Sequence, residues 1–91
     1  MQNSQKVLSE FRKNIMENVR VSSIDYKGNH YIDLRIWIEG DRNGQREEIP
    51  TRKGLRIHSE LLPDLIQALQ QAQDLFKESL AKSSSKTNEK I

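Results

Sequence analysis

The sequence has no cysteine, which excludes a disulfide and any cysteine-based metal site. It also lacks a run of about 18 apolar residues that would span a membrane, and its N-terminus has no signal-peptide apolar segment. We therefore expect an intracellular protein, in the cytoplasm or nucleoid of a bacterium or in the nucleus of a eukaryote. Hydrophobic residues make up only 34% of the 91-residue chain. One small core then gives marginal stability, and self-association is a reasonable way to complete it.

Residues suited to catalysis are sparse. The two histidines, His30 and His58, lie far apart in the sequence and form no HExxH pattern. The four glycines are too dispersed for a phosphate-binding loop, and no GxSxG nucleophile motif is present. We expect no catalytic residue, no metal site and no cofactor, and therefore a protein that is not an enzyme.

Charge is unevenly distributed along the chain, whose net charge is +2. Residues 1–58 contain eleven Lys or Arg and eight Asp or Glu, whereas residues 59–81 contain four acidic residues and one lysine. A basic face suggests a polyanionic partner, although ordinary solubilising charge gives the same counts. Polar ends without apolar periodicity predict a flexible N-terminus at 1–6, a single domain at 7–81 and a flexible tail at 82–91.

Alternating apolar residues predict an antiparallel sheet. Residues 19–26 and 30–39 read as two strands joined by a tight turn at "KGN", where Gly28 permits positive φ. Asn43-Gly44 predicts a second turn within the loop "GDRNG". Residues 51–58 predict a further strand, and the proline before it marks a strand beginning or a sheet edge.

Two more segments complete the expected fold. Residues 7–18 allow either an amphipathic helix or a short strand around Phe11. From Ser59, the expected N-cap, apolar residues recur every three or four positions, which predicts a helix of about 22 residues and about 33 Å. Its apolar residues are Leu61, Leu62, Leu65, Ile66, Leu69, Ala72, Phe76 and Leu80. We expect an α+β domain whose helix covers one face of the sheet and leaves the other face open. The far end of so long a helix would find its partner in a second copy of the chain.

The open face of the sheet is the candidate binding surface. Hairpin geometry places Arg20 and Tyr26 on one side together with Tyr31, Arg35 and Trp37. The remaining cations, on or beside the neighbouring turn and strand, are Lys27, Arg46, Arg52, Lys53 and Arg56. Aromatic rings between cations form a platform for unstacked bases, and each stacked base contributes about 1–3 kcal/mol.

Each of these residues also has a structural interpretation. Trp37 is also suited to burial under the N-terminal segment or to a dimer contact. Arg35 is as well suited to an ion pair with Asp33 or Asp25 as to a phosphate contact. Tyr26 and Tyr31 fit half-buried strand positions. Only their convergence on one face favours nucleic-acid binding.

The segments "VSSIDYKGNHYIDLRIW" and "PTRKGLRI", followed by an amphipathic helix, resemble the positive cofactor four family of transcriptional coactivators. The motifs "YKG", "YIDLR" and "RKGL" stand in the family's order and at its intervals, within a resemblance that covers about residues 19–75. The resemblance implies a curved four-stranded antiparallel sheet with one C-terminal helix. It also implies a first strand near Phe11, a dimer whose helices pack together, and single-stranded DNA held in grooves of the sheet.

The same resemblance implies which residues contact DNA. By motif position they are Tyr26, Lys27, Arg35, Arg52 and Lys53. The family often has a tryptophan at the position of Ile38, whereas here the indole is at Trp37, on the opposite face of the strand. The detailed base contacts therefore do not carry over from the family.

We predict a homodimer that binds single-stranded or melted DNA with little sequence preference, as a transcription cofactor or a replication or repair accessory. Proteins of transcription or repair are possible partners. The alternatives are an RNA-binding module on the same platform and a protein–protein adaptor. The residues predicted to bind nucleic acid are Tyr26, Lys27, Arg35, Trp37, Arg52, Lys53, Arg20, Tyr31 and Arg56. The residues predicted to form the dimer interface are Leu65, Leu69, Ala72 and Phe76.

Overall fold

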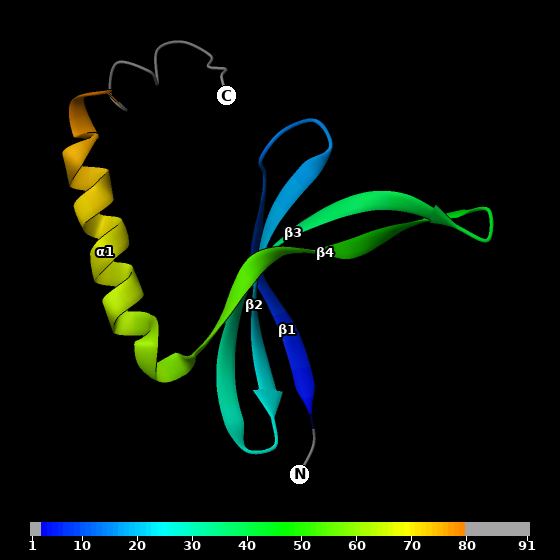
Figure 1. The fold of residues 1–91 in the computed structure, drawn as a ribbon, viewed down its shortest axis with the longest axis horizontal. Helices are drawn as coiled ribbons and strands as arrows, with labels where there is room; N and C mark the ends of the chain where they lie inside the picture. The colour runs from blue at the N-terminus through cyan, green and yellow to red at the C-terminus, as the bar shows by residue number, and fades with distance from the viewer. Residues whose placement is uncertain (1–2, 80–91) are drawn as a thin grey trace. The chain divides into compact units, whose positions relative to one another are not determined.

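The structure, a computed structural model, describes residues 3–79 in two compact units that divide after Ser59. The first is a strand unit and the second a helix unit. The strand unit is a single antiparallel sheet in the order β1-β2-β3-β4 (Figure 1). Its strands are β1 (Ser4–Arg12), β2 (Glu17–Tyr26), β3 (Asn29–Arg42) and β4 (Gln45–His58). The expected α+β class and four-stranded antiparallel sheet are therefore confirmed.

The segment around Phe11, which allowed a helix or a strand, is strand β1. It pairs with β2 from Ser4 opposite Asp25 to Arg12 opposite Asn18, with one irregularity between Val7 and Ser9. β1 therefore begins three residues before the domain boundary expected at residue 7. The pairing explains why the helical interpretation failed, because β2 supplies hydrogen-bond partners that a local sequence pattern does not contain.

Two tight turns connect the longer strands. Lys27 and Gly28 have φ angles of 51° and 81°, and Asn43 and Gly44 have φ angles of 55° and 81°. Positive φ at both central residues is the type I′ conformation, one of the two that are favoured in two-residue hairpins. The second turn is shorter than the loop expected from "GDRNG", because residues 40–42 continue β3. β3 and β4 consequently extend past β2, which ends its pairing at Ile38, and residues 39–48 form a two-stranded arm (Figure 1).

β3 and β4 lose their regular pairing in the middle of the sheet. Arg35 pairs with Gly54, but Trp37 pairs with Pro50, so residues 51–53 stand opposite a single β3 position. The Thr51 hydroxyl donates a hydrogen bond of 2.9 Å to the Ile36 carbonyl oxygen and closes this bulge. A bulge redirects the side chains on either side of it. Pro50 sits on β4, an edge strand, which is where a residue without an N–H is tolerated.

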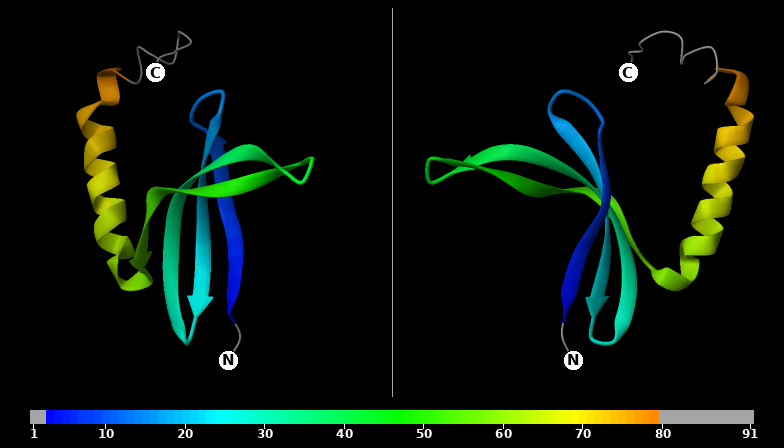
Figure 2. Two further views of the ribbon diagram at one scale, coloured as in Figure 1. Left: turned by 45° about the vertical axis from the view of Figure 1, so that its right-hand side comes forward. Right: turned by 180° about the vertical axis from the view of Figure 1, so that it is seen from behind.

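The two faces of the sheet differ in a way that reverses one expectation. The buried side chains of the described residues, Arg20, Ser22, Ile24 and Asp33, lie on the polar face that was expected to be open. The apolar face opposite, with Leu34, Ile36 and Leu55, is only half-buried or exposed. The strand unit bends strongly (Figure 2). Polar side chains pack against one another on part of the polar face and are buried there.

A 3-10 turn (Ser59–Leu61) starts at the last residue of the strand unit, and the helix unit continues as α1 (Leu62–Leu75). The N-cap is Leu61, without a side-chain hydrogen bond, so the expected capping role of Ser59 is wrong. The 3-10 turn delays the α-helix by three residues, and Pro63 then falls in its first turn, where a missing N–H costs least. α1 has 14 residues, fewer than expected, although residues 77–79 are again helical. Leu80 and the predicted tail at 82–91 lie outside the described residues.

Candidate functional site

A hollow of about 460 Å³ opens on the polar face beside the β3–β4 bulge. Its lining residues are Gln5, Asp33, Arg35, Trp37, Pro50, Thr51, Arg52 and Arg56. Strand pairing explains this grouping, because Asp33 stands opposite Arg56 and Trp37 stands opposite Pro50. The bulge then adds Thr51 and Arg52 to a surface that regular pairing would not give them. We call this surface the arginine hollow.

Arg35 is fixed in the hollow by two partners. Its Nε and Nη2 donate to the Asp33 carboxylate at 3.0 and 2.8 Å, and its Nη1 donates to the Thr51 carbonyl oxygen at 3.0 Å. Arg56 Nε donates to the same carboxylate at 3.3 Å. A single buried carboxylate thus orients two guanidinium groups that arrive from neighbouring strands. The structural interpretation of Arg35, an ion pair with Asp33, is confirmed.

The charge state of this cluster is well defined. Burial raises the pKa of Asp33, but the hydrogen bonds from Arg35 and Arg56 outweigh that effect and hold the pKa below its ordinary value. The Asp33 carboxylate in turn raises the pKa of Arg35. Asp33 is therefore ionised at neutral pH, and with Arg52 the three arginines leave the hollow with a net charge of +2.

Several donors in the hollow have no partner within the described residues. The Arg52 side chain makes no hydrogen bond or ion pair there, and the Arg56 side chain uses only its Nε. Arg35 keeps one N–H on each of its terminal nitrogens, since a guanidinium has five. Planar donors of this kind suit the oxygens of a phosphate, which accept two parallel hydrogen bonds.

Trp37 and Arg20 form a structural pair at the edge of the hollow. The Arg20 guanidinium carbon lies 4.0 Å from the centre of the indole ring. Arg20 is only 8% exposed and forms ion pairs with Glu10, at 3.3 Å, and with Glu48. Arg20 is therefore buried on the face that was expected to be open, because carboxylates from β1 and β4 enclose it. Its predicted contact with nucleic acid stays a prediction. Trp37 lines the hollow, but its Nε1 is buried and has no partner among the described residues.

A smaller hollow continues the polar face toward the β2–β3 turn. It is lined by Asn3, Ser4, Gln5, Ile24, Asp25 and Tyr26. Gln5 borders both hollows, so the two surfaces adjoin. The Tyr26 ring is exposed and has the Lys27 ammonium 5.2 Å from its centre.

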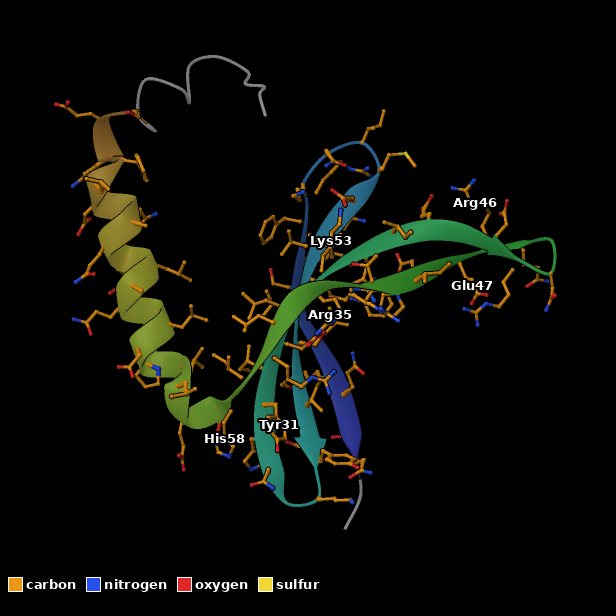
Figure 3. The ribbon with its side chains drawn as sticks, in the orientation of Figure 1. Tyr31, Arg35, Arg46, Glu47, Lys53 and His58 are labelled. Atoms are coloured by element: carbon orange, nitrogen blue, oxygen red, sulfur yellow. The ribbon has the colours of Figure 1, made fainter. Side chains whose placement is uncertain are left out.

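Tyr31 and Lys53 occupy other surroundings. Tyr31 packs edge-on against His58, with ring centres 5.5 Å apart, and is half-buried as its structural interpretation proposed (Figure 3). Lys53 lines an apolar hollow with Lys13, Val19 and Leu55, and its Nζ pairs with Glu17 at 3.2 Å. The bulge separates it from Arg52, its neighbour in the chain, so the structure does not bring Lys53 into the arginine hollow.

Residues of the site that the sequence did not single out are Gln5, Pro50 and Thr51, while Asp33 was considered only as a partner of Arg35. Thr51 gave no usable signal, because its role depends on the bulge. The described residues contain no cluster of three or more potential metal ligands among His, Asp and Glu. None of the helices in residues 3–79 is long and apolar enough to cross a membrane.

Comparison with known proteins places the chain in a family. The family profile described as Transcriptional Coactivator p15 (PC4) matches residues 13–68. A PC4 homologue from Burkholderia pseudomallei K96243 is 36% identical, and the match covers 77% of this chain and 98% of that one, with a TM-score of 0.65. A second, orthorhombic crystal form of that homologue gives 36% identity, coverage of 77% and 90%, and a TM-score of 0.64.

A bacteriophage T5 homologue of the eukaryotic coactivator, implicated in recombination-dependent DNA replication, is 22% identical. That match covers 97% of this chain and 100% of the phage chain, with a TM-score of 0.48. No curated protein sequence matches the chain. The protein is of the α+β class, with an open antiparallel sheet, a helix that follows it in the chain, and a cationic hollow on the polar face of the sheet. The chain belongs to the PC4 family of transcriptional coactivators, as the order of "YKG", "YIDLR" and "RKGL" predicted.

Proposed function

We propose that this protein binds single-stranded DNA, or the separated strands of melted DNA, along the polar face of its sheet. The observation that carries the proposal is the arginine hollow, where Arg35, Arg52 and Arg56 present unpaired N–H donors around a net charge of +2. Phosphates bind such donors, and sequence plays no part in that contact. Membership of a coactivator family supports a role in transcription.

The proposed path of the strand continues from the arginine hollow, past Gln5, to Tyr26 and Lys27. Tyr26 offers an exposed ring for a base, and Lys27 lies beside it for a phosphate. Trp37 contributes a wall of the hollow, with one side of its indole already occupied by Arg20. Stacking is therefore expected mainly at Tyr26, and phosphate binding mainly at the arginines.

A titration with oligo(dT) tests this proposal directly. The single tryptophan, Trp37, lines the hollow and reports binding through its fluorescence. We expect affinity that falls steeply as salt is raised from about 50 to about 200 mM, because each phosphate contact releases a counterion. An unchanged signal at the lowest salt would exclude the proposal, and tighter binding of oligo(U) would favour the RNA alternative.

Arg52 is the most informative position for mutation. Arg52→Ala removes a cation that has no partner in the described chain, so the fold should be unaffected. We expect an affinity loss of about tenfold and a salt slope lower by about 1. The matched control is Arg42→Ala, because Arg42 lies on the distant arm, pairs with Glu47 and lines neither polar hollow. Equal losses in the two variants would mean that binding follows total charge and not this site.

We further propose that the protein is a homodimer whose helices pack together. The apolar stripe of α1 includes Leu65, Leu69 and Ala72, and Phe76 follows at its C-cap. No side chain of α1 is buried, and Leu69 and Phe76 are among the exposed large hydrophobic residues. A second copy of the same stripe would cover these residues symmetrically.

A further inference from the structure

Asp33 is the one carboxylate among the lining residues of a hollow that we propose to bind an anion. It is 3% exposed and accepts hydrogen bonds from Arg35 at 2.8 and 3.0 Å and from Arg56 at 3.3 Å. A negative charge at this position opposes the approach of a phosphate. Its presence therefore calls for an explanation that simple charge attraction does not give.

The hydrogen-bond geometry supplies that explanation. Arginine side chains are long and have many rotamers, and ordering them on binding costs free energy. The Asp33 carboxylate accepts hydrogen bonds from Nε and Nη2 of Arg35, and the Thr51 carbonyl oxygen accepts one from its Nη1. Two N–H groups of Arg35 and all four terminal N–H groups of Arg56 stay without partners in the described chain. The carboxylate thus fixes both guanidinium groups and leaves their outer donors unpaired.

We propose that Asp33 is a positioning residue that preorganises Arg35 and Arg56 for the phosphates of a single strand. This inference rests on the proposed function and adds a prediction to it, namely whether removal of the carboxylate strengthens or weakens binding. If only net charge mattered, removing the carboxylate would strengthen binding to a polyanion. With preorganisation dominant, removing the carboxylate weakens binding, because both arginines lose the anchor that orients them.

Asp33→Asn tests the direction of the change in affinity, because it removes the charge of the side chain at nearly constant size. The matched control is Asp41→Asn, which removes an exposed carboxylate on the arm. We expect Asp33→Asn to lower the affinity for oligo(dT) about tenfold and Asp41→Asn to leave it unchanged or to raise it slightly. Equal or tighter binding by folded Asp33→Asn overturns the inference. Lack of oligo(dT) binding by the unmutated protein would instead overturn the proposed function, and this inference with it.

A second pair of variants decides the matter if Asp33→Asn fails to fold. Arg56→Lys and Arg52→Lys both keep the charge of an exposed residue of the hollow, but only Arg56 is bonded to Asp33. We expect Arg56→Lys to lose several-fold more affinity than Arg52→Lys, since a lysine lacks the fixed fork that Asp33 orients. Equal losses would show that Asp33 does not position its partner for binding.

Discussion

At the scale of single residues, Arg20 and Arg52 show how equal formal charges come to have different roles. Arg52 lines the arginine hollow without a partner in the described chain, whereas Arg20 lies between Glu10, Glu48 and the indole of Trp37. Burial lowers the pKa of Arg20, but the two carboxylates outweigh burial and raise it. Arg20 therefore contributes to the fold, and its charge is already neutralised within the strand unit.

Arg20→Leu should destabilise the protein. The change leaves Glu10 and Glu48 without their shared cation and removes the guanidinium that covers Trp37. Because both carboxylates stay partly exposed, we expect the free energy of unfolding to fall by about 1–3 kcal/mol, less than for a fully buried pair. Urea unfolding followed by Trp37 fluorescence measures it. Arg42→Leu, at an arginine whose side chain is 65% exposed, should cost less than about 0.5 kcal/mol.

Features of the site that depend on local strand alternation could be predicted from the sequence, whereas features that depend on contacts with other strands could not. Arg35, Trp37 and Arg56 could be assigned to one face from the sequence, because side chains alternate along paired strands. The burial of Arg20 could not be predicted, since Glu10 reaches it from β1, whose segment allowed a helix or a strand, and Glu48 reaches it from β4. The separation of Lys53 from Arg52 could not be predicted from the sequence either, because it depends on the bulge.

At the scale of elements, the β3–β4 bulge shapes the site, and Gly54 marks its end. A Cβ at residue 54 would collide with the Leu34 carbonyl oxygen and lie 2.9 Å from the Arg35 Cα. Backbone atoms of a paired strand cannot move aside cheaply. Gly54 therefore lets β3 and β4 come close again immediately after the bulge at residues 51–53. This close approach of the two backbones explains why the "RKG" motif ends in glycine.

Gly54→Ala should destabilise the sheet by about 1–3 kcal/mol, the usual range for overpacking. The affinity for oligo(dT) should also fall, because Arg35 pairs with Gly54. Gly40→Ala is the matched control, since its added Cβ would meet only the end of the Ile49 side chain. Thermal unfolding of both variants measures the difference, and equal shifts would show that the close approach at Gly54 is not needed.

The β1–β2 turn makes stability depend on pH. Hydrogen bonds from Lys13, then Asn14 and Lys53, lower the pKa of Glu17 from 4.5 to about 2. A carboxyl group whose pKa is lowered by folding stabilises the fold above its unfolded pKa and loses that contribution as pH falls toward its folded pKa. The stability of the protein should therefore decline between about pH 4.5 and about pH 2.

Glu17→Gln should make that decline shallower, because glutamine does not titrate. Melting temperatures between pH 2 and pH 6 measure the slope. A carboxyl titration by NMR in Lys53→Met gives an independent check, since loss of the Lys53 hydrogen bond should raise the pKa of Glu17. A slope that is the same in Glu17→Gln and the unmutated protein would contradict this origin of the acid sensitivity.

At the scale of the whole molecule, each unit presents apolar surface. In the strand unit it is the apolar face with Leu34, Ile36 and Leu55, and in the helix unit it is the stripe of α1. The sequence predicted both stripes correctly from periods of two and of about 3.6 residues. It did not predict that the buried residues Arg20, Ser22, Ile24 and Asp33 would gather on the polar face. Periodicity identifies apolar surface but not what covers it.

The proposed dimer makes a clear prediction about mass in solution. Leu69→Asp places a charge in the middle of the α1 stripe, where a symmetric partner would bury it unpaired at a cost of several kcal/mol. We expect the unmutated protein to sediment as a dimer and Leu69→Asp as a monomer or, if the units need each other, as an unfolded chain. Gln71→Asp introduces the same residue on the opposite side of α1 and should leave the dimer intact. Dimers of equal stability in Leu69→Asp and Gln71→Asp would place the subunit interface elsewhere than on this helix.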